Sequence, residues 1–204
     1  DVANAAFFTI FYVPMVPIIV FLFKKKSIHW SVWPSVILCL IGGYLLTNFY
    51  DATVRLGDGL VLLGALFWST HIIFTGMIVT RYNLPLTIGA LQTLIVAILS
   101  FMVCSIYEEF ILINILNEID SILYAGVLSG GFAFVLQIYA QRNIAPAPAA
   151  IIFSLEGVFA SVAAYILLDQ YLNEFKVLGI IIILSAVIFS QLAPIYGKKY
   201  YGRN

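Results

Sequence analysis

One glutamate stands in a stretch of the sequence that otherwise carries no charge. It is Glu156, within "IIFSLEGVFASVAAYILL". A charge at the centre of a lipid-spanning helix costs about 3 kcal/mol on insertion scales, so such groups usually face the bundle interior and serve function. Two interpretations stay open. Glu156 either takes up and releases protons, because apolar surroundings favour its protonated form, or forms a hydrogen bond to a neighbouring helix that fixes their packing.

A second pattern repeats at helical spacing. Gly64, Trp68, His71 and Thr75 follow one another at intervals of 4, 3 and 4 residues, which places them on one helical face. A small gap, an indole, an imidazole and a hydroxyl suit a cavity that binds amphipathic solutes by stacking and a few hydrogen bonds. The alternative is a histidine bonded between helices with the tryptophan packing beside it. We predict that Trp68, His71 and Thr75 contact substrate.

Two amides extend the set of candidate substrate contacts. Gln92 and Gln137 both fall within apolar stretches. Either amide is expected to contact substrate or to bridge helices, an interaction worth about 0.6 to 2 kcal/mol.

The elements that must position these residues are membrane helices. Of the 204 residues, 63% are hydrophobic and 10% are charged, a composition outside that of soluble domains. Runs such as "GIIIILSAVIF" are apolar on every side, which argues against a transmembrane barrel. The prediction is an all-α integral membrane bundle with seven spans, at Ala5 to Phe23, Ser31 to Thr47, Gly59 to Thr80, Leu86 to Ile106, Ser121 to Tyr139, Ala147 to Leu168 and Phe175 to Leu192.

The charges predict the orientation of the spans. Alternating the connections puts eight of the ten basic residues on one side and nine of the ten acids on the other, with Glu156 alone in the membrane. The positive-inside rule then makes the C-terminus cytoplasmic and residue 1 external. Because the sequence starts with Asp1 and carries no signal peptide, we expect that spans are missing before it. The basic side holds Lys24, Lys25, Lys26, Arg81, Arg142, Lys198, Lys199 and Arg203, and the acidic side holds Asp1, Asp51, Asp58, Glu108, Glu109, Glu118, Asp120, Asp169 and Glu174.

The sequence also contains an internal repeat. The segment from Ala3 resembles the segment from Ala145 at an offset of about 144 residues, each with a small-residue entry, a long span, a charged hairpin and a second span. The predicted orientation runs the two copies in opposite directions. Inverted repeats are typical of secondary transporters, in which the substrate site lies near the membrane midplane. Three further spans before the first copy would restore the symmetry, giving five plus five.

The runs "NAAFFTIFYVPMVPIIVFLF", "GDGLVLLGALFWSTHIIFTGMIVTRY" and "GFAFVLQIYAQRNIAPAPAAIIFSLEGVFASVAAYILLDQYLNEFKVLG" resemble the drug/metabolite transporter superfamily, specifically its EamA-domain exporters. The resemblance implies ten helices in two inverted repeats. Residues 1–50 would then be the last two helices of the first repeat, residues 57–194 the second repeat, and residues 195–204 a cytoplasmic tail. Family members commonly have proline after the glutamate that corresponds to Glu156, whereas this sequence has Gly157.

These features predict a secondary transporter that exports small metabolites, such as amino acids, or drugs across a bacterial inner membrane by alternating access. Its expected partners are a small-molecule substrate and the lipid bilayer, with no nucleic acid, metal or cofactor. The competing interpretation is a seven-span receptor, which has no need of two antiparallel copies. The sequence has no H-E-x-x-H, G-x-S-x-G or G-x-x-x-x-G-K-[ST] motif, which argues against an enzyme and against nucleotide-driven pumping.

Overall fold

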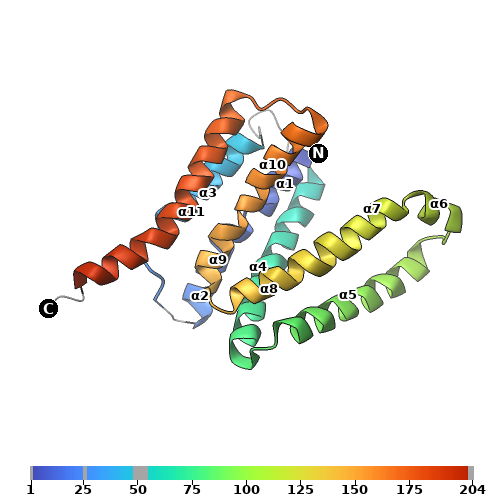
Figure 1. The fold of residues 1–204 in the computed structure, drawn as a ribbon, viewed down its shortest axis with the longest axis horizontal. Helices are drawn as coiled ribbons and strands as arrows, with labels where there is room; N and C mark the ends of the chain where they lie inside the picture. The colour runs from blue at the N-terminus through green and yellow to red at the C-terminus, as the bar shows by residue number, and fades with distance from the viewer. Residues whose placement is uncertain (1, 25–26, 48–54, 202–204) are drawn as a thin grey trace. The chain divides into compact units, whose positions relative to one another are not determined.

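The computed structural model describes residues 2–24, 27–47 and 55–201, and the regular structure in these ranges is helical (Figure 1). Five charged residues of the predicted orientation, Asp1, Lys25, Lys26, Asp51 and Arg203, lie outside the described residues. The helices are α1 Val2–Thr9, α2 Tyr12–Lys24, α3 Val32–Leu46, α4 Leu56–Tyr82, α5 Pro85–Tyr107, α6 Leu112–Asn117, α7 Ile119–Leu123, the π-helical segment η2 Tyr124–Ala133, α8 Phe134–Gln141, α9 Pro146–Phe153, α10 Leu155–Leu168 and α11 Glu174–Tyr201.

The predicted membrane spans correspond closely to these helices. Within the described residues, six helical stretches are long and apolar enough to cross a membrane. The remaining predicted span, Ser31 to Thr47, forms α3, an apolar helix of 15 residues and therefore shorter than the others. The six stretches are Asn4–Phe23, Leu56–Tyr82, Pro85–Tyr107, Ile119–Gln141, Pro146–Leu168 and Glu174–Tyr196.

Local sequence signals explain where several helices begin and end. Pro85 and Pro146 occupy the starts of α5 and α9, where a missing N–H costs no hydrogen bond. Asp58, in the first turn of α4, accepts a hydrogen bond from the Arg55 backbone N–H at 2.7 Å. The same Asp58 oxygen accepts a second hydrogen bond from Asn4 Nδ2 at 2.9 Å, which ties the start of α4 to α1.

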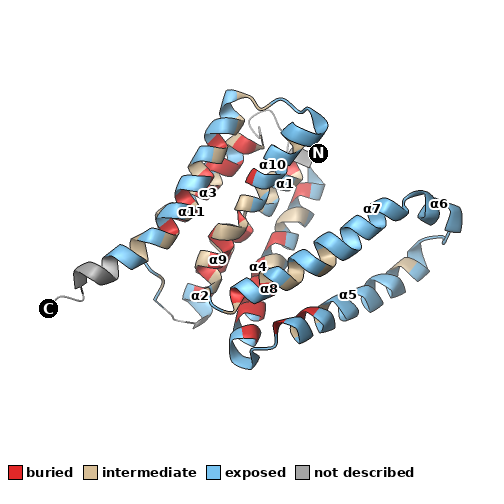
Figure 2. Ribbon diagram, viewed as in Figure 1, coloured by how far each residue is buried: buried red, intermediate tan, exposed pale blue. Residues whose placement is uncertain are grey.

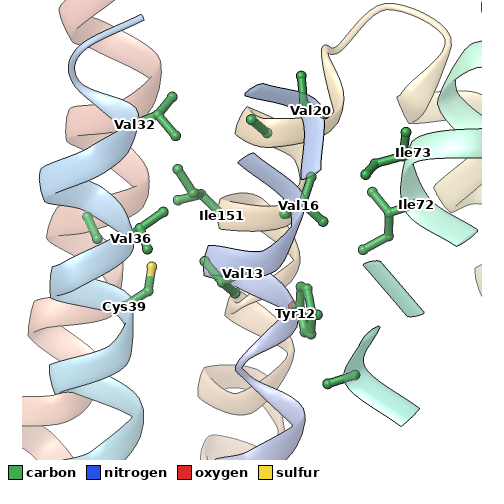
Figure 3. Packing of buried hydrophobic residues seen from close by; sticks show 14 residues of the cluster. Tyr12, Val13, Val16, Val20, Val32, Val36, Cys39, Ile72, Ile73 and Ile151 are labelled. Atoms are coloured by element: carbon green, nitrogen blue, oxygen red, sulfur yellow. The ribbon is translucent and has the colours of Figure 1, made fainter. Parts of the chain in front are cut away.

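The chain divides into two compact units, and the first comprises residues 1–74 and 145–204. Its core is a continuous apolar cluster contributed by α2, α3, α4, α9 and α11, and Figure 2 shows buried residues along these helices. In the close view, α2 carries Val13 and Val16 with α3 and Ile151 on one side and Ile72 of α4 on the other (Figure 3). In lipid such a core gains little from the hydrophobic effect, so close van der Waals packing must hold it together.

The closest helix crossing of this unit joins α3 to α11. A Cβ added at Gly179 would lie 2.6 Å from the Gly42 carbonyl oxygen and 2.9 Å from the Leu46 backbone nitrogen. Backbone atoms cannot move aside as a flexible side chain can. The crossing therefore requires glycine at position 179.

The second unit, residues 75–144, is a sparsely packed helical hairpin. Its helices meet at Gly89 of α5, where a Cβ would lie 3.1 Å from Val135 Cγ2. The π-helical segment η2 contains Gly130 and Gly131, whose added Cβ atoms would lie 3.2 and 3.3 Å from carbonyl oxygens five residues earlier. Glycine at both positions relieves this crowding, which helps the wide helix to form.

We predict that Gly179→Ala destabilises the protein, because the new methyl group must push apart two backbones. Overpacking of this kind costs about 1 to 3 kcal/mol. The matched control is Gly64→Ala, since a Cβ at Gly64 meets nothing within 4 Å and alanine favours helix. Thermal unfolding of the purified variants in detergent should show a lower midpoint for Gly179→Ala alone. Equal midpoints for both variants would contradict the close crossing.

Candidate functional site

The first predicted span is interrupted near its middle. α1 ends at Thr9 and α2 begins at Tyr12. Pro14 has no N–H to donate to the Ile10 carbonyl four residues earlier, and its ring crowds that carbonyl. The Ile10 carbonyl instead accepts from the Val13 N–H at 2.9 Å, a tighter bond that spans three residues. The proline therefore accounts for the interruption.

The sixth predicted span is interrupted at Ser154, between α9 and α10. The Ser154 N–H donates to the Ile151 carbonyl at 3.2 Å, again across three residues, and the Ser154 hydroxyl donates to the same oxygen at 2.6 Å. No proline lies within α10. The hydroxyl of Ser154, which bonds to the backbone of the preceding turn, is therefore the local cause of this interruption. Gly157 stands where family members commonly have proline. In this chain the helix is interrupted just before that position without a proline.

The two interruptions occupy equivalent positions of the predicted repeat. Adding the offset of 144 to the turn residues Ile10 and Phe11 gives Ser154 and Leu155, the last residue before α10 and its first residue. The two copies of the predicted repeat therefore interrupt the span at the same register through different residues, proline in one and serine in the other. At each interruption a hydrogen bond across three residues replaces the regular bond across four, and in lipid any backbone group left over must be satisfied by protein or water.

Glu156 lies directly after the second interruption. It is in the first turn of α10, where the positive end of the helix dipole favours a negative charge. Its side chain is exposed among the described helices. Within the described residues it has neither a hydrogen bond nor an ion pair that neutralises it.

A thiol from α3 contacts the interruption beside Glu156. Cys39 Sγ lies 3.4 Å from Ser154 Oγ, and both side chains are buried. Since the Ser154 hydroxyl already donates to the Ile151 carbonyl, the hydroxyl oxygen is available to accept from the thiol. This contact joins α3 to the interruption at Ser154, two residues before Glu156.

The predicted stripe of α4 is only partly enclosed. The Trp68 and His71 rings stack, with centroids 5.0 Å apart and planes at 18°. Trp68 packs against the core cluster of the first unit, and Thr75 is 5% exposed. Gly64 faces open space. The structure thus brings the indole and imidazole together as one aromatic surface.

The two predicted amides lie in the second unit. Gln92 is a half-buried residue of α5, and Gln137 is a half-buried residue of α8. Gln137 Nε2 is buried and has no acceptor among the described residues. An amide that lacks a protein partner in a membrane helix is available to a polar ligand or to water.

Sequence reasoning missed Tyr12. This residue opens α2, and its phenol is 4% exposed. Tyr12 lies in the same core cluster as Cys39. The repeat offset could have found it, because 156 minus 144 is 12. The described residues contain no group of three or more His, Cys, Asp or Glu side chains able to hold a metal ion.

Two comparisons show which known proteins this chain resembles. Residues 55–192 match the EamA-like transporter family. An "Uncharacterized transporter" from Archaeoglobus fulgidus is 30% identical over 189 residues, which are 93% of this chain and 60% of that relative. This chain therefore spans about three fifths of the length of the relative. Since the family match covers most of its residues, the chain belongs to the EamA-like transporter family and is a membrane protein with multiple transmembrane helices.

Proposed function

We propose that this protein is a secondary transporter that exports small metabolites, such as amino acids, or drugs by alternating access. The family supports transport, and the charge distribution supports a cytoplasmic C-terminus in a bacterial inner membrane. Residues 1–50 and 57–194 would belong to two inverted repeats, with residues 195–204 as a tail. In such transporters one repeat moves against the other around a midplane site.

The observation that carries this proposal is the carboxylate at an interrupted span. Interrupted helices place backbone groups and helix ends at the membrane midplane, where secondary transporters bind substrates and coupling ions. Glu156 lies in the first turn after such an interruption, exposed and without a counter-ion among the described residues. A carboxylate of this kind can take up and release a proton or a cationic substrate. If Glu156 served only to hold two helices together, its buried carboxyl group would need a hydrogen-bond partner.

The aromatic surface of α4 supplies a contact for the apolar part of a solute. Trp68 and His71 present stacked rings, and Thr75 adds a hydroxyl one turn further along the same helix. In the second unit, Gln92 and the unpaired amide nitrogen of Gln137 are the proposed polar contacts. Together these residue types favour amphipathic organic solutes over inorganic ions.

We expect Glu156→Gln to abolish solute flux driven by a proton gradient, because the amide cannot exchange a proton. Solute exchange across equal proton concentrations should persist. The measurement is uptake of radiolabelled amino acids and cationic dyes by proteoliposomes, with and without an imposed pH gradient. Glu174→Gln, at the exposed start of α11, is the control. Equal loss of driven flux and exchange would show a structural role instead.

We expect Trp68→Ala to raise the KM for transported solute by about 2- to 12-fold, because one aromatic contact contributes about 0.5 to 1.5 kcal/mol. Phe67→Ala is a matched control, because Phe67 is the preceding residue of α4 and is 67% exposed. Concentration-dependent uptake by equal amounts of each protein gives the comparison. If Trp68→Ala changes only the protein yield, the tryptophan is a packing residue.

A further inference from the structure

Two arginines lie at one end of the helical hairpin formed by residues 75–144. Arg81 is in the last turn of α4, and Arg142 follows directly after α8. Arg142 Nη1 donates a hydrogen bond to Asn83 Oδ1 at 3.1 Å, and the Thr80 hydroxyl lies 3.5 Å from the Arg142 backbone carbonyl oxygen. These contacts hold the end of α8 beside the turn between α4 and α5. The two arginines therefore lie on adjoining segments of the chain.

Each of these guanidinium groups lies over a tyrosine ring. The Cζ atom of Arg81 is 5.5 Å from the centre of the Tyr82 ring, and that of Arg142 is 5.0 Å from the centre of the Tyr139 ring. A ring face attracts a cation but carries no charge that could neutralise it. The tyrosines therefore restrict where the guanidinium groups lie and leave their positive charges uncompensated.

The hydrogen-bonding groups left over by these side chains are donors. A guanidinium has five N–H donors and no acceptor, and Arg142 uses one of them on Asn83. Because Asn83 accepts that bond through its Oδ1 atom, its amide nitrogen also remains as a donor. Neither arginine forms an ion pair with a carboxylate among the residues that the structure describes. A ligand that complements this group is an anion with several oxygen atoms.

The acidic residues of the hairpin lie at its other end, near α6, whereas the arginines lie near the α4–α5 turn (Figure 1). Between the two ends, α5 has 23 residues and is therefore about 34 Å long. This length is several times the Debye length of about 8 Å, so the acids do not neutralise the arginines. The acids are Glu108, Glu109, Glu118 and Asp120.

Exposed apolar side chains flank the two arginines. Leu84 and Leu86 follow Arg81 at the start of α5, and Leu136 lies on α8 before Arg142; each leucine is more than half exposed. Tyrosine and arginine together are typical of the headgroup level of a membrane, with leucine on the side of the acyl chains. A phospholipid offers a phosphate to the arginines and acyl chains to the leucines. A soluble anion would leave the leucines uncovered.

We propose that Arg81 and Arg142 bind the phosphate of an anionic phospholipid, with Asn83 positioning the Arg142 guanidinium. The predicted orientation puts this end of the hairpin at the cytoplasmic leaflet, whose anionic lipids attract arginine and lysine close to the membrane. The bound lipid would bridge α8 and the α4–α5 turn. This inference goes beyond the proposed transport function and shares with it only the predicted orientation.

The test measures lipid binding by the purified chain in detergent. Phosphatidylglycerol, which is anionic, and phosphatidylcholine, which is zwitterionic, are added with identical acyl chains, and native mass spectrometry gives the fraction of protein that carries lipid. The original protein should bind phosphatidylglycerol with a Kd about fivefold or more below that for phosphatidylcholine. Arg81→Gln and Arg142→Gln should each raise the Kd for phosphatidylglycerol about fivefold, because each removes one charge close to the phosphate.

Two controls accompany these variants. Arg55→Gln removes the same charge from an exposed residue just before α4 and should leave the Kd unchanged. Arg81→Gln protects against a folding artefact, since the exposed Arg81 side chain makes no hydrogen bond within the described part of the chain. Glycerol phosphate, the anionic headgroup without acyl chains, is added at a concentration equal to that of the lipid and should not displace it.

Three results would overturn the proposal. The first is an equal Kd for phosphatidylglycerol in the original protein and in the Arg81→Gln, Arg142→Gln and Arg55→Gln variants. The second is equal binding of the two lipids by the original protein. The third is displacement of the lipid by equimolar glycerol phosphate, which would assign the arginines to a soluble anion. Since lipid binding is measured without flux, these failures are distinct from failure of the transport proposal.

Discussion

Backbone hydrogen bonding in hydrocarbon is the constraint on which this structure depends. A membrane helix can lose a backbone bond only where protein, ligand or water satisfies the freed group. Here two spans lose regular bonding at the same register of the predicted repeat, at Ile10–Phe11 and at Ser154. The first loss follows from Pro14 and the second from the Ser154 hydroxyl. Different local causes at one register indicate that the interruption itself matters to the protein.

The interruptions decide what the side chains beside them can do. Glu156 lies in the first turn of α10, directly after the break. The same break contacts Cys39 of α3, which lies in one core cluster with Tyr12. Around these groups the first unit is held by close packing, which reaches backbone contact at Gly42 and Gly179. Rigid packing beside exposed polar groups is the arrangement expected of a site that binds ligands transiently.

Much of this arrangement could be predicted from the sequence, because hydropathy and charge are properties of the residues themselves. The helical spans and the isolated position of Glu156 followed from them directly. The exposure of the Glu156 side chain could not be predicted in this way, because it depends on which helices the fold places beside it. The break at Ser154 was also hidden, since serine is common in regular helices and the usual proline is replaced by Gly157. Tyr12 was overlooked because an aromatic residue in an apolar run carries no signal until the repeat register is applied.

The central claim is that Glu156 faces an aqueous substrate path and not lipid. It can be tested with Glu156→Cys in a Cys104→Ser background, since the other cysteine, Cys39, is fully buried. Phe159→Cys, on the exposed apolar surface of α10, reports on lipid. The measurement is the labelling rate in membranes with a small charged methanethiosulfonate. We predict fast labelling of Glu156→Cys, slowed by a transported solute, and little labelling of Phe159→Cys. Equally slow labelling of both cysteines would contradict the claim.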